Sequence, residues 1–205
     1  MKLFKDRKAA GKILAERLKD AKADLVLGIP RGGVVVAAEI ANQLSLPLDI
    51  LVTRKIGAPD QPELALGAID PDGEAVWDKD LIQQLKIENL KLEIQESWKE
   101  LKRREDIYRQ DKKPMDVNRK KVILVDDGMA TGATVQAAVR YLERHGAYIL
   151  LAIPVASKDA LVKIREIEGI REIILETPEN FRAVGQFYKE FEPVSDEDVV
   201  KLLEL

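Results

Sequence analysis

The 205-residue chain has no cysteine, a single histidine and only 5% aromatic residues. The lack of cysteine excludes disulfide bonds and thiolate chemistry, and it fits a reducing compartment. No stretch approaches the roughly 18 consecutive apolar residues that a membrane-spanning helix needs, and the first residues contain no apolar signal core. We therefore expect a soluble, cytoplasmic protein without a membrane partner.

An excess of positive charge is also missing, since the formal net charge is −3 at pH 7. Nonspecific binding of nucleic acid depends on a basic surface, so the composition argues against a nucleic-acid partner. The length predicts one domain, residues 1–205, which is large enough to bury about 70% of the surface that the unfolded chain exposes.

Most of the chain alternates between the apolar patterns of strands and of helices. Strands are predicted at residues 25–29, 49–53, 122–125, 148–154 and 172–175, and helices near 11–19, 34–44, 134–144, 158–166 and 195–203. Such alternation predicts an α/β fold with a parallel sheet and helices on both faces. Ligands then bind outside the carboxyl ends of the strands.

Residues 57–121 interrupt this alternation and form a predicted insertion. Within it, residues 64–77 are typical of a hairpin, with Asp-Pro-Asp-Gly as the turn. One long helix is predicted to follow, because apolar residues recur every three or four positions from Ile87 to Tyr108. Packing within the chain is the favoured use of this apolar stripe. A homodimer contact is a second use, and we expect a dimer.

The most informative segment follows the apolar residues 122–125 and is a turn rich in small and hydroxyl-bearing residues, 128–134, that opens a helix. A strand end that leads into a helix presents free N–H groups and the positive end of the helix dipole to one point, which suits a phosphate. Gly132 permits close approach of the backbone, and the hydroxyls of Thr131 and Thr134 add donors.

Asp126 and Asp127 stand between this strand and the turn, where a phosphate alone would be repelled. Carboxylates suit a sugar diol, and a divalent cation that bridges diol and phosphate oxygens would relieve the negative charge. Successive strand residues point to opposite faces, so both acids reach one ligand only if the strand ends by Val125, as we predict. The segment therefore indicates a site for a phosphorylated sugar.

Other interpretations of this segment fit less well. A plain acidic loop with a capping threonine is one of them. The chain has no Gly-Lys-Ser/Thr here, and no Gly-x-Gly-x-x-Gly with a distal ribose-binding acid, which argues against the common phosphate-binding loops of other nucleotide sites.

Residues 126–134, Asp-Asp-Gly-Met-Ala-Thr-Gly-Ala-Thr after four apolar residues, closely resemble the phosphoribosyl pyrophosphate (PRPP) signature of type I phosphoribosyltransferases. The resemblance implies transfer of ribose 5-phosphate from PRPP to a nucleobase or related nitrogen acceptor, as in nucleotide salvage, with Mg²⁺ as cofactor and pyrophosphate as product. It implies that Asp126 and Asp127 bind the ribose and the metal. The implied contacts of the 5′-phosphate are Ala130, Thr131, Gly132, Ala133 and Thr134.

Residues 28–33, Gly-Ile-Pro-Arg-Gly-Gly, resemble the pyrophosphate loop of the same family. Arg31 suits a polyphosphate because its guanidinium forks onto two oxygens, and the amides of Gly32 and Gly33 would face the same edge of the sheet. A cis peptide is frequent in this loop of the family, which makes Pro30 to Arg31 the candidate bond. A glycine-rich turn with a surface arginine is the alternative.

Arg54 and Lys55 are predicted to close the second strand and to form a second cationic pair at this edge. In the family a basic residue at this place often contacts the pyrophosphate. Ordinary strand-end cations are the alternative, because such residues are common.

The carboxyl-terminal residues 176–205 resemble the hood of purine-type members, which implies the type I fold with a small hood over the base. Phe181 is the candidate for stacking on the base, although packing within the hood explains it equally well. His145 is predicted to end a helix and not to catalyse. Ala130 and the apolar residues 153–155 depart from the hypoxanthine/guanine type. The rival hypothesis is a regulatory protein that senses PRPP or a nucleotide without turnover.

Overall fold

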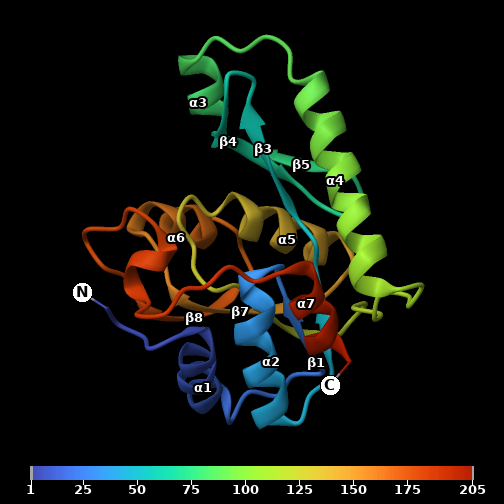
Figure 1. Ribbon diagram of the computed structural model, residues 1–205, viewed down its shortest axis with the longest axis vertical. Helices are drawn as coiled ribbons and strands as arrows, with labels where there is room; N and C mark the ends of the chain where they lie inside the picture. Colours follow the sequence, from blue (N-terminus) through green and yellow to red (C-terminus); the bar gives the residue numbers. More distant parts are fainter. Residues whose placement is uncertain (1, 205) are drawn as a thin grey trace.

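A parallel five-stranded sheet forms the centre of the computed structural model, which describes residues 2–204 (Figure 1). The strands lie in the order β2 (Leu48–Ile50), β1 (Leu25–Gly28), β6 (Lys121–Val125), β7 (Tyr148–Val155) and β8 (Arg171–Glu176). All of β1 and all but the first residue of β6 are buried, as expected for Val-, Ile- and Leu-rich strands covered on both faces. The predicted parallel sheet is confirmed, although β2 ends earlier than predicted.

Helices cover both faces of this sheet, as the sequence predicted (Figure 1). One face carries α1 (Arg7–Leu18) and α2 (Gly32–Leu44), and the other carries α5 (Ala133–Arg144) and α6 (Lys158–Arg165). The buried stripe of α5 consists of Val135, Ala137, Ala138, Val139 and Leu142. Burying one Val or Leu side chain contributes about 1.5 to 3 kcal/mol, so this stripe fixes the helix that carries the turn after β6.

The insertion begins with a small antiparallel sheet of β3 (Arg54–Ala58), β4 (Gln61–Ile69) and β5 (Ala75–Trp77). Two helices follow, α3 (Lys79–Gln84) and α4 (Lys91–Arg109). In Figure 1, α3, β4 and β5 stand above α5, and α4 runs down beside it. The predicted hairpin is confirmed as β4 and β5, but it gains β3 as a third strand. The small sheet therefore starts at the residues that were predicted to close the second strand of the large one.

The predicted long helix of the insertion is confirmed as α4, but it begins at Lys91 and not at Ile87, and the short helix α3 precedes it. Lys86 adopts a left-handed conformation with φ of 53°, which ends the first helix, and the side chain of Asn89 accepts the N–H of Lys91 at 3.0 Å. Ile87 and Leu90, counted as part of the helical stripe, therefore lie before α4. Apolar spacing alone did not reveal this later start, because apolar residues continue through the turn before α4.

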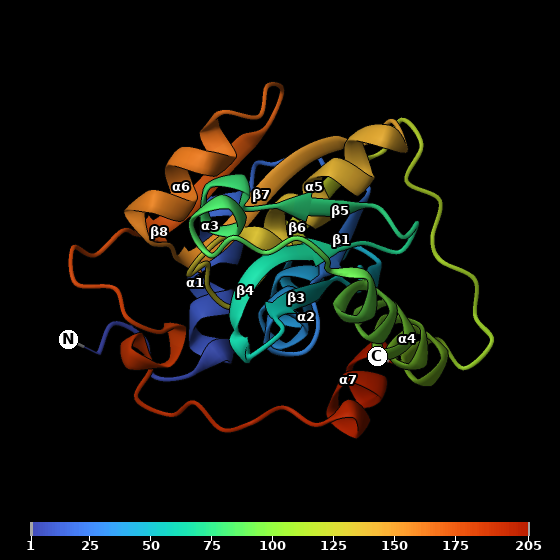
Figure 2. The same cartoon turned by 90° about the horizontal axis from the view of Figure 1, so that it is seen from above.

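The carboxyl-terminal helix α7 (Asp196–Leu203) packs beside α4 and α2, as Figure 2 shows for α4. The short helix η1 (Val184–Phe187) lies in the segment that leads to it. Within residues 2–204, every helix is too short or too polar to cross a lipid bilayer.

The amino-terminal segment is hydrogen-bonded to the residues that follow η1. The N–H groups of Leu3 and Phe4 donate to the carbonyl of Phe187 at 2.8 and 3.0 Å, and Lys189 N–H donates to Phe4 O at 2.9 Å. Helix α1 then begins earlier than predicted, because the Asp6 carboxylate accepts the N–H of Ala9 at 2.7 Å. The first and last parts of the chain thus form one unit beside the sheet.

Candidate active site

Two loops leave the sheet side by side at its carboxyl edge. Gly28, the last residue of β1, is in register with Val125, the last residue of β6, and Ile29 N–H donates to Val125 O at 2.8 Å. The prediction that β6 ends by Val125 is confirmed. The chain segments after Gly28 and after Val125 therefore begin at the same height and face one region.

The acid pair after β6 lies against the loop after β1. A Cβ atom on Gly33 would lie 2.8 Å from Cα and 2.9 Å from Oδ1 of Asp126, so only glycine allows this approach. Asp126 Oδ1 accepts the N–H of Asp127 at 2.8 Å. Burial raises the pKa of the Asp126 carboxyl well above its ordinary range, the charge of Asp127 raises it further, and the charge of Lys55 opposes the rise.

Asp127 has two partners that the sequence did not reveal. Arg7 donates from Nε to Asp127 Oδ2 at 2.7 Å, and the Tyr188 hydroxyl donates to the main-chain carbonyl of Asp127 at 2.6 Å. Burial raises the pKa of Asp127, and the charge of Arg7 opposes that rise. The one sequence signal for Arg7 is a cation in the first turn of a helix, where the helix dipole favours acids.

The predicted phosphate turn forms the amino end of α5. Gly132 caps this helix with φ of 81°, a conformation that glycine adopts at little cost, and Gln136 N–H donates to Gly132 O at 2.8 Å. The first N–H groups of a helix have no partners within the helix, which suits the start of α5 to an anion. The N–H of Ala133 donates to Thr131 Oγ1 at a long 3.5 Å. Thr131 lies exposed at the mouth of the turn.

Ser157 anchors this turn to the next strand and was also missed in the sequence. Its hydroxyl donates to Ala130 O at 2.6 Å and accepts the N–H of Ala160 at 3.1 Å, so it caps α6 as well. The N–H of Ser157 donates to Met129 O at 2.8 Å. A serine between a strand and a helix was the available signal, but the sequence did not show that its hydroxyl reaches the turn after β6.

We expect Ser157→Ala to lower the free energy of unfolding by about 0.5 to 2 kcal/mol, because a helix cap is lost. The variant should also bind ribose 5-phosphate more weakly, because Ala130 O loses its donor. Urea unfolding and calorimetry measure the two effects. Ser195→Ala is the matched control, since Ser195 caps α7 by accepting Asp198 N–H at 3.1 Å. Equal loss of ligand affinity in both variants would contradict a local role for Ser157.

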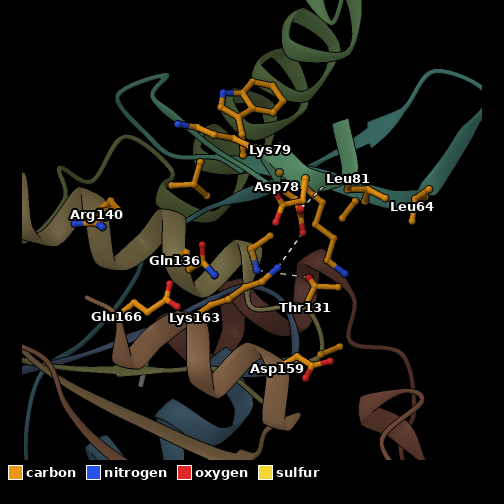
Figure 3. Close-up of a pocket in the computed structure, with 18 of the residues that line it drawn as sticks. Leu64, Asp78, Lys79, Leu81, Thr131, Gln136, Arg140, Asp159, Lys163 and Glu166 are labelled. Atoms are coloured by element: carbon orange, nitrogen blue, oxygen red, sulfur yellow. Dashed lines mark hydrogen bonds and ion pairs between the residues drawn. The ribbon is translucent and has the colours of Figure 1, made fainter. Parts of the chain in front are cut away.

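A cleft of about 660 Å³ separates the insertion from α5 and α6 (Figure 3). Thr131 and Gln136 line it from the side of α5, and Lys55 lines it from β3. Lys163 of α6 reaches across the cleft, and its Nζ forms an ion pair with Asp78 Oδ2 at 2.9 Å. Asp78 caps α3, so this ion pair connects α6 to the insertion. The phosphate turn thus opens into a cavity that both parts of the chain enclose.

Arg54 and Lys55 do not act as one pair at the sheet edge. Both belong to β3, and they point to different sides of it. Lys55 lines the cleft, whereas Arg54 lies near Arg104 of α4. Burial and the charge of Arg104 lower the pKa of Arg54, and its Nε atom has no hydrogen-bond partner among residues 2–204. The structure therefore brings Lys55, and not Arg54, to the cleft.

Arg31 lies at the start of α2, directly after a cis peptide bond between Pro30 and Arg31, as the resemblance implied. Its side chain is 42% exposed, and NH1 lies 3.7 Å from Asp196 Oδ1. Asp196 also accepts a hydrogen bond from the Tyr108 hydroxyl at 2.6 Å. Because the contact between Arg31 and Asp196 is long and exposed, the guanidinium is available to an anionic ligand.

Comparison with known proteins shows which family the chain belongs to. Residues 4–189 match the phosphoribosyl transferase domain family. The chain belongs to this family. Two relatives from strains of Mycobacterium tuberculosis, provisionally named phosphoribosyl transferases, are 42% identical over 209 residues, which cover 100% of this chain and 47% of each relative. The chain thus spans about half the length of these curated relatives.

Solved structures agree with the phosphoribosyl transferase fold. A crystal structure of a Thermus thermophilus protein is 39% identical, has a TM-score of 0.80 and covers 98% of this chain and 97% of its own. A hypothetical protein from Neisseria gonorrhoeae with bound ppGpp is 16% identical, with a TM-score of 0.57, and covers 100% of this chain and 96% of its own. The second likeness shows the fold alone.

Phe181 and His145 are the two remaining side chains of the phosphoribosyl transferase domain for which the sequence makes a prediction. Phe181 packs within the hood, where its ring centroid lies 5.0 Å from that of Phe187. Stacking of Phe181 on a base stays a prediction. His145 ends α5, as predicted, and its Nε2 atom lies 3.0 Å from Asp72 Oδ2 in the hairpin turn.

The acid pair also bears on metal binding by the phosphoribosyl transferase domain. Among residues 2–204, no group of three or more His, Cys, Asp or Glu side chains could hold a metal ion. Mg²⁺ is commonly bound through one or two carboxylates together with substrate oxygens and waters. Asp126 and Asp127 fit that pattern, in which the cation arrives with the ligand.

Proposed function

We propose that the protein is a Mg²⁺-dependent phosphoribosyltransferase that moves ribose 5-phosphate from PRPP to a nitrogen of a nucleobase or related acceptor and releases pyrophosphate. One observation carries the proposal: the aligned ends of β1 and β6 bring an anion-binding turn, an acid pair and an arginine loop to one edge of the sheet. Membership of the family supports it. The homodimer and the cytoplasmic location stay predictions.

Each part of the site has a task in this proposal. The turn from Ala130 to Thr134 holds the 5′-phosphate with the N–H groups at the start of α5. Asp126 and Asp127 accept hydrogen bonds from the ribose hydroxyls and would hold Mg²⁺, which supplies positive charge next to the pyrophosphate. Arg31 and the amides of Gly32 and Gly33 bind the pyrophosphate, and Lys55 faces it across the cleft.

The reaction forms a bond between the acceptor nitrogen and C1 of the ribose and breaks the bond between C1 and the pyrophosphate oxygen. The electron pair of the broken bond leaves with the pyrophosphate, where Arg31 and Lys55 stabilise the charge. The acid pair holds the ribose while C1 gains oxocarbenium character. No side chain here acts as an evident general base. An acceptor whose nitrogen is already deprotonated needs none.

The acceptor is best sought with a panel of purines, pyrimidines and small amines. Ala130 and the buried residues Ile153 and Val155 stand where hypoxanthine/guanine-type members carry an acid and a base-reading lysine, which disfavours a 6-oxopurine. Release of pyrophosphate from PRPP and Mg²⁺ is measured with each acceptor. Turnover with one member of the panel supports the proposal, and Asp126→Asn, assayed at a low concentration of PRPP, serves as the control with weakened donor binding.

A nucleotide sensor without turnover is the second candidate. The structural relative from Neisseria gonorrhoeae holds ppGpp, so ppGpp belongs in a binding panel together with PRPP and nucleotides. Tight binding of one of these ligands, with no pyrophosphate released across the whole acceptor panel, would favour the sensor over the enzyme.

We expect Arg31→Ala to weaken inhibition by pyrophosphate about five- to tenfold, the effect of about 1 to 1.5 kcal/mol for a partly exposed charged hydrogen bond. Affinity for ribose 5-phosphate should stay nearly constant, because Arg31 lies at the other loop. Inhibition assays and calorimetry measure the two constants. Arg17→Ala, an exposed arginine at the end of α1, is the control. If the inhibition constant of pyrophosphate equals that of the wild type, Arg31 does not bind pyrophosphate.

A further inference from the structure

Arg7 occupies an unusual position for a cation. It is the first residue of α1, directly after the capping residue Asp6. The amino end of a helix carries partial positive charge, so a positive side chain there opposes helix formation. The helix therefore gives no reason for an arginine, and the reason is to be sought in the contacts of the side chain.

The guanidinium of Arg7 is held on three sides. Its Nε donates to Asp127 Oδ2 at 2.7 Å, and its NH1 donates to Glu192 O at 2.8 Å. Its central carbon lies 3.7 Å from the ring centroid of Phe191. The side chains of Arg7 and Asp127 are only 11% and 14% exposed, so the ion pair is shielded from water. This is a fixed contact, unlike the exposed pair at Arg31.

The hood also holds Asp127 through its main-chain carbonyl. The Tyr188 hydroxyl donates to Asp127 O at 2.6 Å, and the Tyr188 ring stacks on Phe191 with centroids 5.1 Å apart. A Cβ atom on Gly32 would collide with the Asp127 carboxylate and would lie 2.8 Å from Arg7 Nε. The loop after β1 thus packs directly on the ion pair.

We propose that Arg7 is a positioning residue of the donor site and acts through Asp127. This inference rests on the proposed function, because it assigns a task within the PRPP site. Arg7 fixes the direction of one oxygen of the Asp127 carboxylate, and the second oxygen is left for the ribose hydroxyls. It also cancels one of the two negative charges of the acid pair, which reduces repulsion of a polyanionic donor.

The absence of Arg7 has two consequences under this proposal. Asp127 loses the partner that sets its orientation, and the donor meets two uncompensated carboxylates in place of one. Both effects weaken the binding of PRPP, whereas the binding of a neutral acceptor changes little. Arg7→Met keeps the length of the side chain and its packing on Phe191, so it removes mainly the charge and the two hydrogen bonds.

The test is a double-mutant cycle between Arg7→Met and Asp127→Asn, read by calorimetry with Mg²⁺ and PRPP. We expect Arg7→Met to lower the affinity for PRPP about tenfold in the wild-type background, because a charged hydrogen bond is lost. In the Asp127→Asn background the same change should have almost no effect, because the partner is absent. Arg7→Lys should recover part of the affinity, because an ammonium group restores the positive charge but not both hydrogen bonds of the guanidinium.

Several outcomes would overturn the inference. An equal loss in both backgrounds would mean that Arg7 acts only on the fold, and thermal unfolding of each variant identifies such a loss. Should Arg7→Met not fold, the cycle is run with Arg7→Lys, and a PRPP affinity equal to that of the wild type then contradicts the inference. Arg17→Met controls for loss of surface charge on α1. If the wild type itself binds no PRPP, the proposed function fails and not this inference alone.

Discussion

Asp126→Asn is expected to weaken donor binding and to stabilise the fold at the same time. Asparagine still accepts the N–H of Asp127 through its carbonyl oxygen, so the local hydrogen bond survives. The negative charge that, under the proposed function, binds the ribose hydroxyls and the cation is lost. We expect the affinity for Mg²⁺ and PRPP to fall by about 1.5 to 3 kcal/mol, which is roughly 10- to 150-fold.

The gain in stability follows from the raised pKa of Asp126. Burial and the nearby Asp127 raise this pKa in the folded state above the value of about 3.9 in the unfolded chain. A carboxyl group whose pKa is raised by folding stabilises the folded state at pH values below its pKa in the unfolded chain. That stabilisation is lost as the pH rises through its pKa in the folded protein. Asparagine carries no charge and does not lose this stabilisation. The folded variant should therefore become more stable relative to the folded wild type as the pH rises.

Calorimetric titration and thermal unfolding between pH 4 and 8 measure both effects of Asp126→Asn. Asp159→Asn is the control, because Asp159 is an exposed acid of the first turn of α6 that also lines the cleft. Full donor affinity in Asp126→Asn would remove the acid from the site. A melting temperature that falls below that of the wild type at neutral pH would contradict the account of the buried charge.

Gly33→Ala should have the second large effect. The new Cβ atom would lie 2.8 Å from Asp126 Cα and 2.9 Å from Val125 O, and backbone atoms cannot move away as a flexible side chain can. Forcing a methyl group into such a contact costs about 1 to 3 kcal/mol of stability. The loop after β1 must shift away from the acid pair, so PRPP affinity should fall at least as far as in Asp126→Asn.

Urea unfolding and PRPP titration of Gly33→Ala are compared with those of Gly169→Ala. Gly169 has φ of 79° and no atom within 4 Å of a new Cβ, so alanine there strains only the backbone, by about 1 to 2 kcal/mol. That control should lose stability but keep its donor affinity. If Gly33→Ala binds PRPP as tightly as Gly169→Ala, close packing of the two loops is not needed for the site.

The sequence was sufficient for the parts of the site that lie along one stretch of chain. The apolar run before Asp126, the glycine at 132 and the helix after it predicted a strand, a turn and a helix in the right order. Each depends on neighbours in the sequence, so local pattern was enough. The late start of α4, at Lys91 although the apolar spacing begins at Ile87, shows where a local pattern stops being specific.

The partners that hold the site together come from distant parts of the chain. Arg7 and Asp127 are 120 positions apart, and Ser157 reaches a carbonyl 27 positions away. The residues next to Arg7 and Ser157 in the sequence do not identify the atoms that these side chains bond. They follow from the order of the strands and from the docking of the amino-terminal segment on the hood, which are tertiary properties. A helix that begins with an unfavourable cation was the available hint.

The bond from Arg7 to Glu192 O joins residues 185 positions apart. Contacts between such distant residues form only after a large loop has closed, and they delay folding. During synthesis the strand that leads to Asp127 is complete well before Glu192 has left the ribosome. The nascent chain therefore carries its two acids without the cover of the hood until the hood meets the amino-terminal helix.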